Sequence, residues 1–441
     1  MTDISIFSKE KCNRYNPRPS ISIITNSKTT TKKNGKDFTF LLNISRSDKC
    51  VGIFNGIGEN GSDFSKTAGE FIMESFRDEW NKLKTYCIED RNKFEQLILN
   101  IFNMTEEYLD IRYSELNDGG TRAVVLGIFR NNGETYTFTT NLGDSPCVLF
   151  NKDEDTIKHM WTDHSPDNPS EYKRYCEKVD LNKRKPFIYN SVNVFDKKGE
   201  PVGPKVDYKG PLNIFDYVNN KVVVNRDNYN LLLKTNIPLG GCKSVRRHII
   251  ENDGEQSVHP DHIHENSYAT IAGLTTNTRM FGCFKIKRDC YLDCRPSISV
   301  EKVTTDNYFV IGVPGFYNLW WFKDIRDLLK RDDTINSRSS CNLLYTQLIR
   351  NAQEENYKLL NKEHPCWEDI TFGVIYISDN LSDDEFQNMY IQDIVNNDDT
   401  EERINIQPKI NKKKIKNSVI KRNARKRRKR RRMLNNPKNR R

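Results

Sequence analysis

Residues 51–61 read VGIFNGIGENG, and this stretch decides how the rest of the chain is interpreted. Its first four residues suit a buried strand, its glycines suit a tight turn, and apolar residues recur at helical spacing after it. The backbone at such a strand-to-helix junction can approach a ligand closely. The turn is therefore the first candidate for a functional site.

The glycines at 56, 58 and 61 match the G-x-G-x-x-G pattern of dinucleotide-binding loops. That fingerprint also needs a second parallel strand, ending near an acidic residue about 20 residues further on. Here two helical patterns, spanning about 45 residues, precede the next strand pattern, so no strand–helix–strand unit is completed. The sequence disfavours a dinucleotide site.

The hydrophobic pattern predicts a chain of mixed strands and helices. Short apolar or alternating runs predict strands at residues 21–26, 37–44, 51–54, 121–129, 135–142, 146–150, 297–300, 308–313 and 370–377. Helical spacing predicts helices over residues 94–109, 319–329 and 341–360. Two further helices are predicted to begin at a cap, one at Ser62 or Asp63 and one at Asn168, which Pro169 follows. Strands 121–129 and 135–142 are separated by a turn containing Asn-Gly, which predicts a hairpin.

Composition limits where this chain is expected to work. Hydrophobic residues make up 36% of its 441 residues, and no run of about 18 apolar residues exists that would span a membrane. The first residues lack the apolar core of a signal peptide, and the eleven cysteines have no paired spacing. We expect reduced thiols, no secretion, no membrane partner and an intracellular, nuclear or virion-associated location.

Positive charge is concentrated at the C-terminus. Residues 411–441 hold 17 of the 70 Lys and Arg residues and no acid, so residues 1–410 carry 53 basic and 60 acidic side chains. Eight cations are consecutive: Arg425, Lys426, Arg427, Arg428, Lys429, Arg430, Arg431 and Arg432. Such a run predicts binding to nucleic acid phosphates or to nuclear import factors. Residues 379–402 hold nine acids and no base.

These shifts in composition predict four segments. They are an irregular leader (1–20), a folded domain (21–378) with an irregular insertion at about 180–270, an acidic linker (379–410) and a basic tail (411–441). The two charged blocks would each repel internally and attract one another. We expect them to be disordered or docked together.

Seven motifs occur in an order that matches one known family. They are VGIFNGIGENG, GGTRAVVLGIF (119–129), TTNLGDSPCVLF (139–150), TDHSPDNPSEYKRYCEK (162–178), TRMFGCF (278–284), VIGVPGFYNLW (310–320) and EDITFGVIYI (368–377). In this order the chain resembles the metal-dependent serine/threonine protein phosphatases of the 2C type. The resemblance covers roughly residues 21–378. It implies an α+β fold with a central antiparallel β-sandwich flanked by pairs of helices.

The resemblance also implies a chemistry against which the residues can be tested. The family hydrolyses phosphoserine and phosphothreonine with two Mg²⁺ or Mn²⁺ ions about 3.5–4 Å apart. At an effective dielectric constant near 20, two such dications repel by roughly 18 kcal/mol. Clustered carboxylates must offset this repulsion, so the count of acidic ligands decides whether the site is competent.

Several positions at which the family has functional residues have changed. The resemblance places Asn55 at the metal-bridging Asp, Pro314 at the Asp of a Ser-Asp-Gly turn, and Cys283 at the Asp after an arginine-containing turn. Ile57 stands at the general-acid His. Lys32 falls near the phosphate-binding Arg, but lysine is a point charge without the planar fork of arginine.

A few oxygen ligands remain. Asp37 is retained, Lys36 stands loosely at the Glu before it, and Glu368 replaces an Asp with Asp369 beside it. Asp37 and Glu368 are thus the residual metal ligands. Asp144 matches a position that contacts an accessory metal, but the favoured interpretation is that it fixes its turn through hydrogen bonds to the backbone. About two carboxylates are left for a centre that needs four or five.

We therefore expect an inactive phosphatase-like domain without a bound cofactor, acting as a binding or scaffold protein for a phosphoprotein or kinase. One alternative is a divergent active phosphatase that uses Mg²⁺ or Mn²⁺. Another is a nucleic-acid-associated virion protein that acts through its tail. The abundance of Asn, Lys, Ile and Asp suggests an AT-rich coding source, such as a large DNA virus of protists or a protozoan.

Overall fold

We describe the fold from a computed structural model of the chain. The structure describes residues 18–27, 36–45, 47–116, 119–151, 156–165, 168–178, 188–191, 215–225, 267–270, 277–304, 307–317, 322–331, 343–344, 370–378 and 390–393.

The first sheet contains the opening stretch in β3, an inner strand. Its strand order is β13-β5-β4-β3-β2, and a short strand, β12, pairs with β4 beside this path. The strands are β2 (Phe38–Asn43), β3 (Lys49–Ile57), β4 (Gly120–Asn131), β5 (Glu134–Leu142), β12 (Phe281–Gly282) and β13 (Ser297–Val303). The predicted hairpin joins β4 to β5, and Asn132 and Gly133 at its tip both have positive φ angles (51° and 86°), as a type I′ turn requires.

The second sheet has the order β16-β1-β15-β14-β6-β7. Its strands are β1 (Arg18–Ser27), β6 (Cys147–Asn151), β7 (Ile157–His159), β14 (Asn307–Gly312), β15 (Ile370–Ser378) and β16 (Tyr390–Asp393). Neighbouring strands are antiparallel except β16, which runs parallel to β1.

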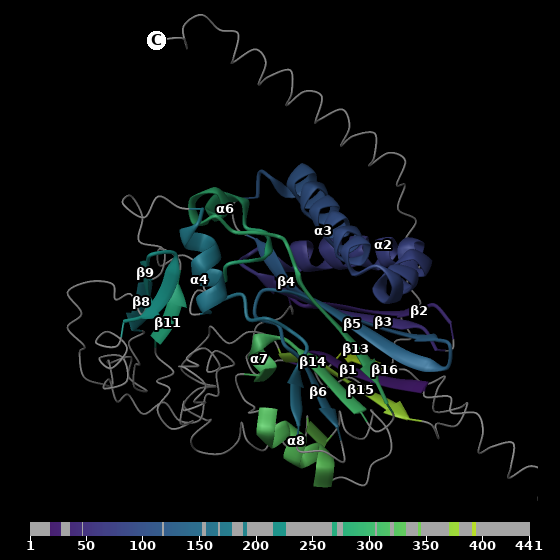
Figure 1. Cartoon of the computed structure of the whole chain (residues 1–441). Helices are drawn as coiled ribbons and strands as arrows, with labels where there is room; N and C mark the ends of the chain where they lie inside the picture. Colours follow the sequence, from purple (N-terminus) through teal and green to yellow (C-terminus); the bar gives the residue numbers. More distant parts are fainter. Residues whose placement is uncertain are drawn as a thin grey trace, which may run out of the picture.

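The two sheets form a sandwich with helices on both outer faces (Figure 1). Between the sheets lies an aliphatic core to which the first sheet contributes Val51, Ile53, Val124 and Leu126 and the second contributes Phe309, Ile311, Ile375 and Ile377. Helices α2 (Gly61–Glu89) and α3 (Arg91–Tyr113) cover the first sheet, with an aromatic-rich core beneath them. Helices α7 (Pro314–Tyr317) and α8 (Phe322–Arg331) cover the second. The predicted α+β class with a central antiparallel sandwich is confirmed.

A smaller group of elements lies at one end of the sandwich (Figure 1). It contains α4 (Pro169–Cys176), α6 (Phe284–Cys290), the strand pair β8 (Ile188–Ser191) with β11 (Ser267–Thr270), and the hairpin of β9 (Phe215–Val218) with β10 (Lys221–Val224). Tyr172 and Tyr175 of α4 pack with Phe215, Met280 and Cys290. The four short strands fall within the segment predicted to be an irregular insertion.

Two strands of the second sheet lie at the predicted segment boundaries. Strand β1 begins at Arg18, within the predicted leader, and β16 pairs with β1 from within the segment predicted to be a linker. The cap predicted at Ser62 or Asp63 is wrong, because α2 begins at Gly61 with Asn60 as its N-cap and without a side-chain cap bond. The cap predicted at Asn168 is confirmed by its hydrogen bond from the Ser170 backbone N–H.

Candidate functional site

Asn55 and Arg122 face one another on neighbouring strands. They are direct register partners in the antiparallel pair β3–β4, so their side chains lie on the same face of the sheet. Arg122 Nη1 donates to Asn55 Oδ1 at 2.9 Å, and Thr121 donates to the Asn55 carbonyl at 3.0 Å. Arg122 is only 5% exposed, so its charge is buried.

Asp37 joins this pair immediately before β2 begins. Asn55 Nδ2 donates to Asp37 Oδ1 at 2.7 Å, and Asp37 is buried. Asn55 thus uses its amide nitrogen toward the carboxylate and its amide oxygen toward the guanidinium. A carboxylate at position 55 could not do both, because an ionised carboxylate only accepts hydrogen bonds.

Asp144 approaches Arg122 from the turn that follows β5. Arg122 Nε lies 3.0 Å from Asp144 Oδ1, and both side chains are buried. The Asn277 amide, oriented to suit both neighbours, donates to Asp144 Oδ1 at 3.0 Å and accepts from Arg122 Nη2 at 3.2 Å. A Cβ atom at Gly143 would lie 2.8 Å from Arg122 Cγ, so glycine there makes room for the arginine stem. We call Asp37, Asn55, Arg122, Asp144 and Asn277 the arginine cluster.

His164 supports the turn that carries Asp144. Its Nδ1 accepts from the Gly143 backbone N–H at 3.0 Å, so the ring proton is on Nε2, which lies 2.7 Å from Ser297 Oγ. Burial lowers the pKa of His164 to about 3, and the nearby Arg279 acts in the same direction. The ring is therefore neutral and holds the turn in place.

Two further changed positions pack against the apolar group at α4. Ile57 and Cys283 both pack against the apolar group formed by Tyr172 and Tyr175 of α4. Cys283 is the N-cap of α6 with a φ of 52°, and its N–H donates to the Gly119 carbonyl at 2.7 Å. Its place is thus determined by backbone geometry and apolar packing.

Pro314 is buried at the first position of α7, directly after β14. Proline is favoured there because its missing N–H would have no helical partner. The position therefore starts a helix.

Glu368, Asp369, Lys32 and the eight consecutive cations of the tail lie outside the described residues. Among the residues that are described, no three His, Cys, Asp or Glu side chains gather as a metal site would require.

The structure reveals two participants that the sequence alone did not: Arg122 and Asn277. Arg122 is the single charged residue in the strand segment GTRAVVLGIF, which was a usable signal because a strand buried on both faces rarely contains a charge. Asn277 had no such signal, because it comes from a segment more than 130 residues further along the chain.

The glycines of the opening stretch serve close packing between chain segments. A Cβ at Gly56 would lie 2.4 Å from the Lys36 carbonyl oxygen and 2.5 Å from that of Gly61. Gly58 has a φ of 79°, which favours glycine. These residues bring the end of β3, the start of α2 and residue 36 together.

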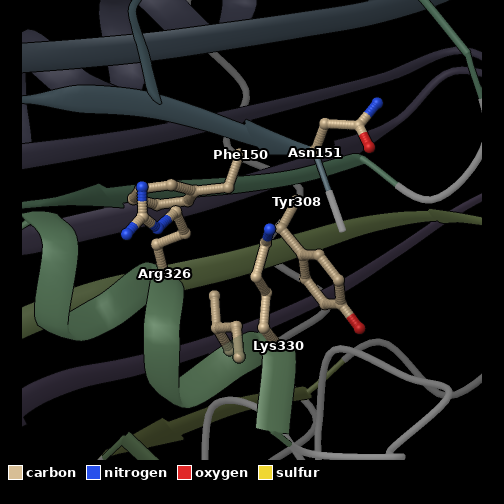
Figure 2. Close-up of a pocket in the computed structure, with 6 residues that line it drawn as sticks. Phe150, Asn151, Tyr308, Arg326 and Lys330 are labelled. Atoms are coloured by element: carbon tan, nitrogen blue, oxygen red, sulfur yellow. The ribbon is translucent and has the colours of Figure 1, made fainter. Parts of the chain in front are cut away.

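A pocket lies between α8 and the second sheet (Figure 2). Phe150, Asn151, Tyr308, Arg326, Leu329 and Lys330 line it. Its cavity volume is about 10 Å³, room for about one water molecule and far below the 300–1,000 Å³ typical of ligand sites. The arginine cluster contributes no residue to it.

Comparison with known proteins relates part of the chain to one family. Residues 39–179, 141 of the 441 residues, match the family model Protein phosphatase 2C, so this part of the chain is PP2C-like. A search of curated proteins finds no match for the chain.

Solved structures similar to this chain share little sequence with it. A serine-threonine phosphatase 2C from Toxoplasma gondii has 12% identity and a TM-score of 0.48, with 82% of this chain and 98% of that chain covered. A C. elegans sex determining protein has 12% identity and a TM-score of 0.45, covering 84% and 67%. Serine/threonine phosphatase Stp1 from Staphylococcus aureus has 11% identity and a TM-score of 0.42, covering 81% and 94%.

Among the described helices, none is long and apolar enough to cross a membrane.

Proposed function

We propose that this PP2C-like domain does not hydrolyse phosphate esters and acts instead as a binding or scaffold protein. The observation that carries the proposal is the buried guanidinium of Arg122 between Asn55 and Asp144. The guanidinium places a positive charge beside Asp144, one of the carboxylates from which a metal centre of this fold would be built.

The donor set of the arginine cluster does not fit Mg²⁺ or Mn²⁺. These ions take oxygen ligands, with carboxylates favoured. Asn55 is neutral, and its oxygen already accepts from Arg122. A dication close to Asp144 would also lie close to the guanidinium 3.0 Å from that carboxylate, and like charges repel strongly where water is excluded.

Metal affinity tests the proposal most directly. In Asn55→Asp/Arg122→Ser, the cation is removed and positions 37, 55 and 144 all carry carboxylates. Calorimetric titration should show Mn²⁺ binding at least about tenfold tighter than in the parent chain, because three carboxylates replace two. The variant should also melt at a higher temperature when Mn²⁺ is added, since a ligand that binds only the folded state stabilises it.

The matched control adds Asp37→Ala to that variant and should lose the gain in Mn²⁺ affinity. Phosphatase assays with excess Mn²⁺ on the parent chain complete the design. Mn²⁺-dependent turnover by the parent that disappears in Asp37→Ala would overturn the proposal in favour of a divergent active enzyme.

A second function is favoured by the sequence of the tail. Seventeen Lys or Arg and no acid within residues 411–441 suit electrostatic binding of nucleic acid, without base specificity. The full chain should bind DNA with a steep salt dependence, and a chain lacking 411–441 should not. Equal binding by both would refute a role for the tail.

A further inference from the structure

A second group of charges lies where α4 packs against residues 277–295, in the small group of elements beside the sandwich (Figure 1). We call Arg174, Lys178, Arg279 and Arg295, with the carboxylates Glu171 and Asp293, the α4 charge cluster. It shares no residue with the arginine cluster, and none of the predicted phosphatase site residues belongs to it.

Glu171 holds two of these cations rigidly. It is 1% exposed, and it pairs with Arg279 Nη2 at 2.5 Å and with Arg174 Nη2 at 2.9 Å. Burial opposes its ionised form, yet the positive charges around it hold the pKa of Glu171 at about 2. Arg279 also donates to the Arg295 carbonyl at 2.9 Å, so it is committed to internal contacts.

Asp293 pairs with the two remaining cations and also with Arg174. Its Oδ2 lies 2.6 Å from Arg295 Nη2, 3.3 Å from Lys178 Nζ and 3.4 Å from Arg174 Nη1. Burial opposes ionisation of this carboxyl, but hydrogen bonds from Arg295 and the charge of Lys178 lower the pKa of Asp293. One carboxylate oxygen therefore serves cations from three residues.

The cluster carries an excess of positive charge that reaches solvent. Four cations face two carboxylates, and the other charged residues near the end of α4, Lys173 and Glu177, cancel one another. The Lys178 and Arg295 side chains are 41% and 46% exposed. An incoming anion with two charges would neutralise the excess and relieve repulsion between the cations.

We propose that the α4 charge cluster binds the phosphoryl group of a phosphoserine or phosphothreonine on a partner protein. A phosphorylated side chain carries −1.5 to −2 charges at pH 7, which matches the excess of two. Arg295 supplies a planar guanidinium for paired hydrogen bonds to phosphate oxygens, and Lys178 supplies a second point charge. A phosphoprotein would then be the class of partner that the domain binds. This inference rests on the proposed function, because an active phosphatase would hydrolyse the phosphoryl group and release the partner.

The neighbouring surface offers a contact for the peptide as well. Tyr291 is 41% exposed, and its ring meets that of Tyr175 edge to face at 6.0 Å. An exposed aromatic ring beside a cationic group suits a peptide that presents one phosphate and some apolar surface.

The test measures binding of the full chain to a phosphoserine peptide whose other side chains are neutral, at about 0.15 M salt. The unphosphorylated peptide and inorganic phosphate serve as comparison probes. Arg295→Gln should raise the Kd of the phosphopeptide about tenfold, because it removes the paired hydrogen bonds of the guanidinium. Lys178→Gln should raise it about threefold, because it removes a single point charge. Lys302→Gln is the matched control, since that lysine pairs with Glu134 on a different part of the surface and is 57% exposed. It should leave the Kd within twofold.

The basic tail would bind the same probe, so the site of contact must be located. A phosphopeptide with a photo-crosslinker should label residues near Lys178 or Arg295, and thermal melts should show that Lys178→Gln stays folded. Crosslinks to 411–441 alone, or equal Kd values for Lys178→Gln and Lys302→Gln, would overturn the proposal. Tighter binding of single-stranded RNA than of phosphopeptide, lost in Arg295→Gln, would overturn it in favour of a nucleic acid site. Phosphate release from the peptide would refute the proposed inactivity, whereas the proposed binding site would still be judged by the Kd values and the crosslinks.

Discussion

Replacing Arg122 by methionine should destabilise the domain by about 3–5 kcal/mol, the usual cost of removing one partner from a buried ion pair. The geometry supports a value in this range. At 3.0 Å and an effective dielectric constant near 20, the attraction between Arg122 and Asp144 is roughly 5.5 kcal/mol before the cost of desolvating the arginine is subtracted. The substitution would also leave the Asn55 oxygen without the guanidinium donor that now satisfies it.

A double-mutant cycle separates the pair from the general effect of substitution. Asp144→Asn removes the partner charge while keeping the shape of the side chain. Arg122→Met combined with Asp144→Asn should cost about 1–3 kcal/mol less than the sum of the single variants, because neither then leaves a buried charge behind. Arg122→Lys should have a smaller effect than Arg122→Met, because it keeps the charge and loses the planar fork.

Urea unfolding followed by tryptophan fluorescence measures these differences, because Trp80 and Trp161 are both buried in the sandwich cores. With a slope near 3 kcal/mol per M, Arg122→Met should lower the midpoint by about 1–1.7 M. Arg91→Met is the control, since Arg91 forms an exposed pair with Glu95 and such pairs contribute about 0–1 kcal/mol. If Arg122→Met costs no more than Arg91→Met, the guanidinium is not the buried charge that holds this site together.

Three further outcomes follow from the structure. The pKa of His164 is about 3 in the folded chain and near 6.5 when unfolded, so its contribution to stability is present above pH 6.5 and is lost as the pH falls toward 3. His164→Gln should therefore reduce the acid sensitivity by up to about 5 kcal/mol in pH-dependent urea melts. Burial lowers the pKa of Lys49 to about 8, so the free energy of unfolding should rise by up to about 3 kcal/mol as the pH rises from 8 to 10.5. Lys49→Met should remove this rise in the same urea melts. Gly127→Ala should destabilise by about 1–3 kcal/mol, because its Cβ would lie 2.3 Å from the Phe138 ring, and a midpoint equal to the parent's would contradict this packing.

Strand patterns predicted the sandwich well because they are local. The Asn-Gly turn between β4 and β5, the apolar run of β15 and the helical spacing of α2 and α3 all reflect constraints within one element. Strand β16 was missed for the opposite reason. Its residues, Tyr390–Asp393, lie in an acidic segment without alternating apolar residues, and it pairs with β1 from the other end of the chain.

The site was predictable only in part, for the same physical reason. The positions of Asp37, Asn55 and Asp144 could be deduced from the order of the motifs. Their mutual contacts depend on Arg122, whose partners come from separate segments of the chain. No spacing within a single segment reports such a cluster, and the sequence therefore suggested that Asp144 fixed its own turn instead of pairing with an arginine.

Asn55 explains how Asp37 can be buried beside this cluster. The Asn55 amide nitrogen lies 2.7 Å from Asp37 Oδ1 and donates to it. With a carboxylate at position 55, two acceptors would face one another at that distance, and at an effective dielectric constant near 20 their charges would repel by roughly 6 kcal/mol. A proton, or the Arg122 charge that Asp144 already shares, would be needed to offset that repulsion. The amide removes it by presenting a donor to Asp37 and an acceptor to Arg122. Asn55 therefore serves both neighbours: it gives Arg122 an acceptor, and it gives Asp37 a donor that an ionised carboxylate could not supply.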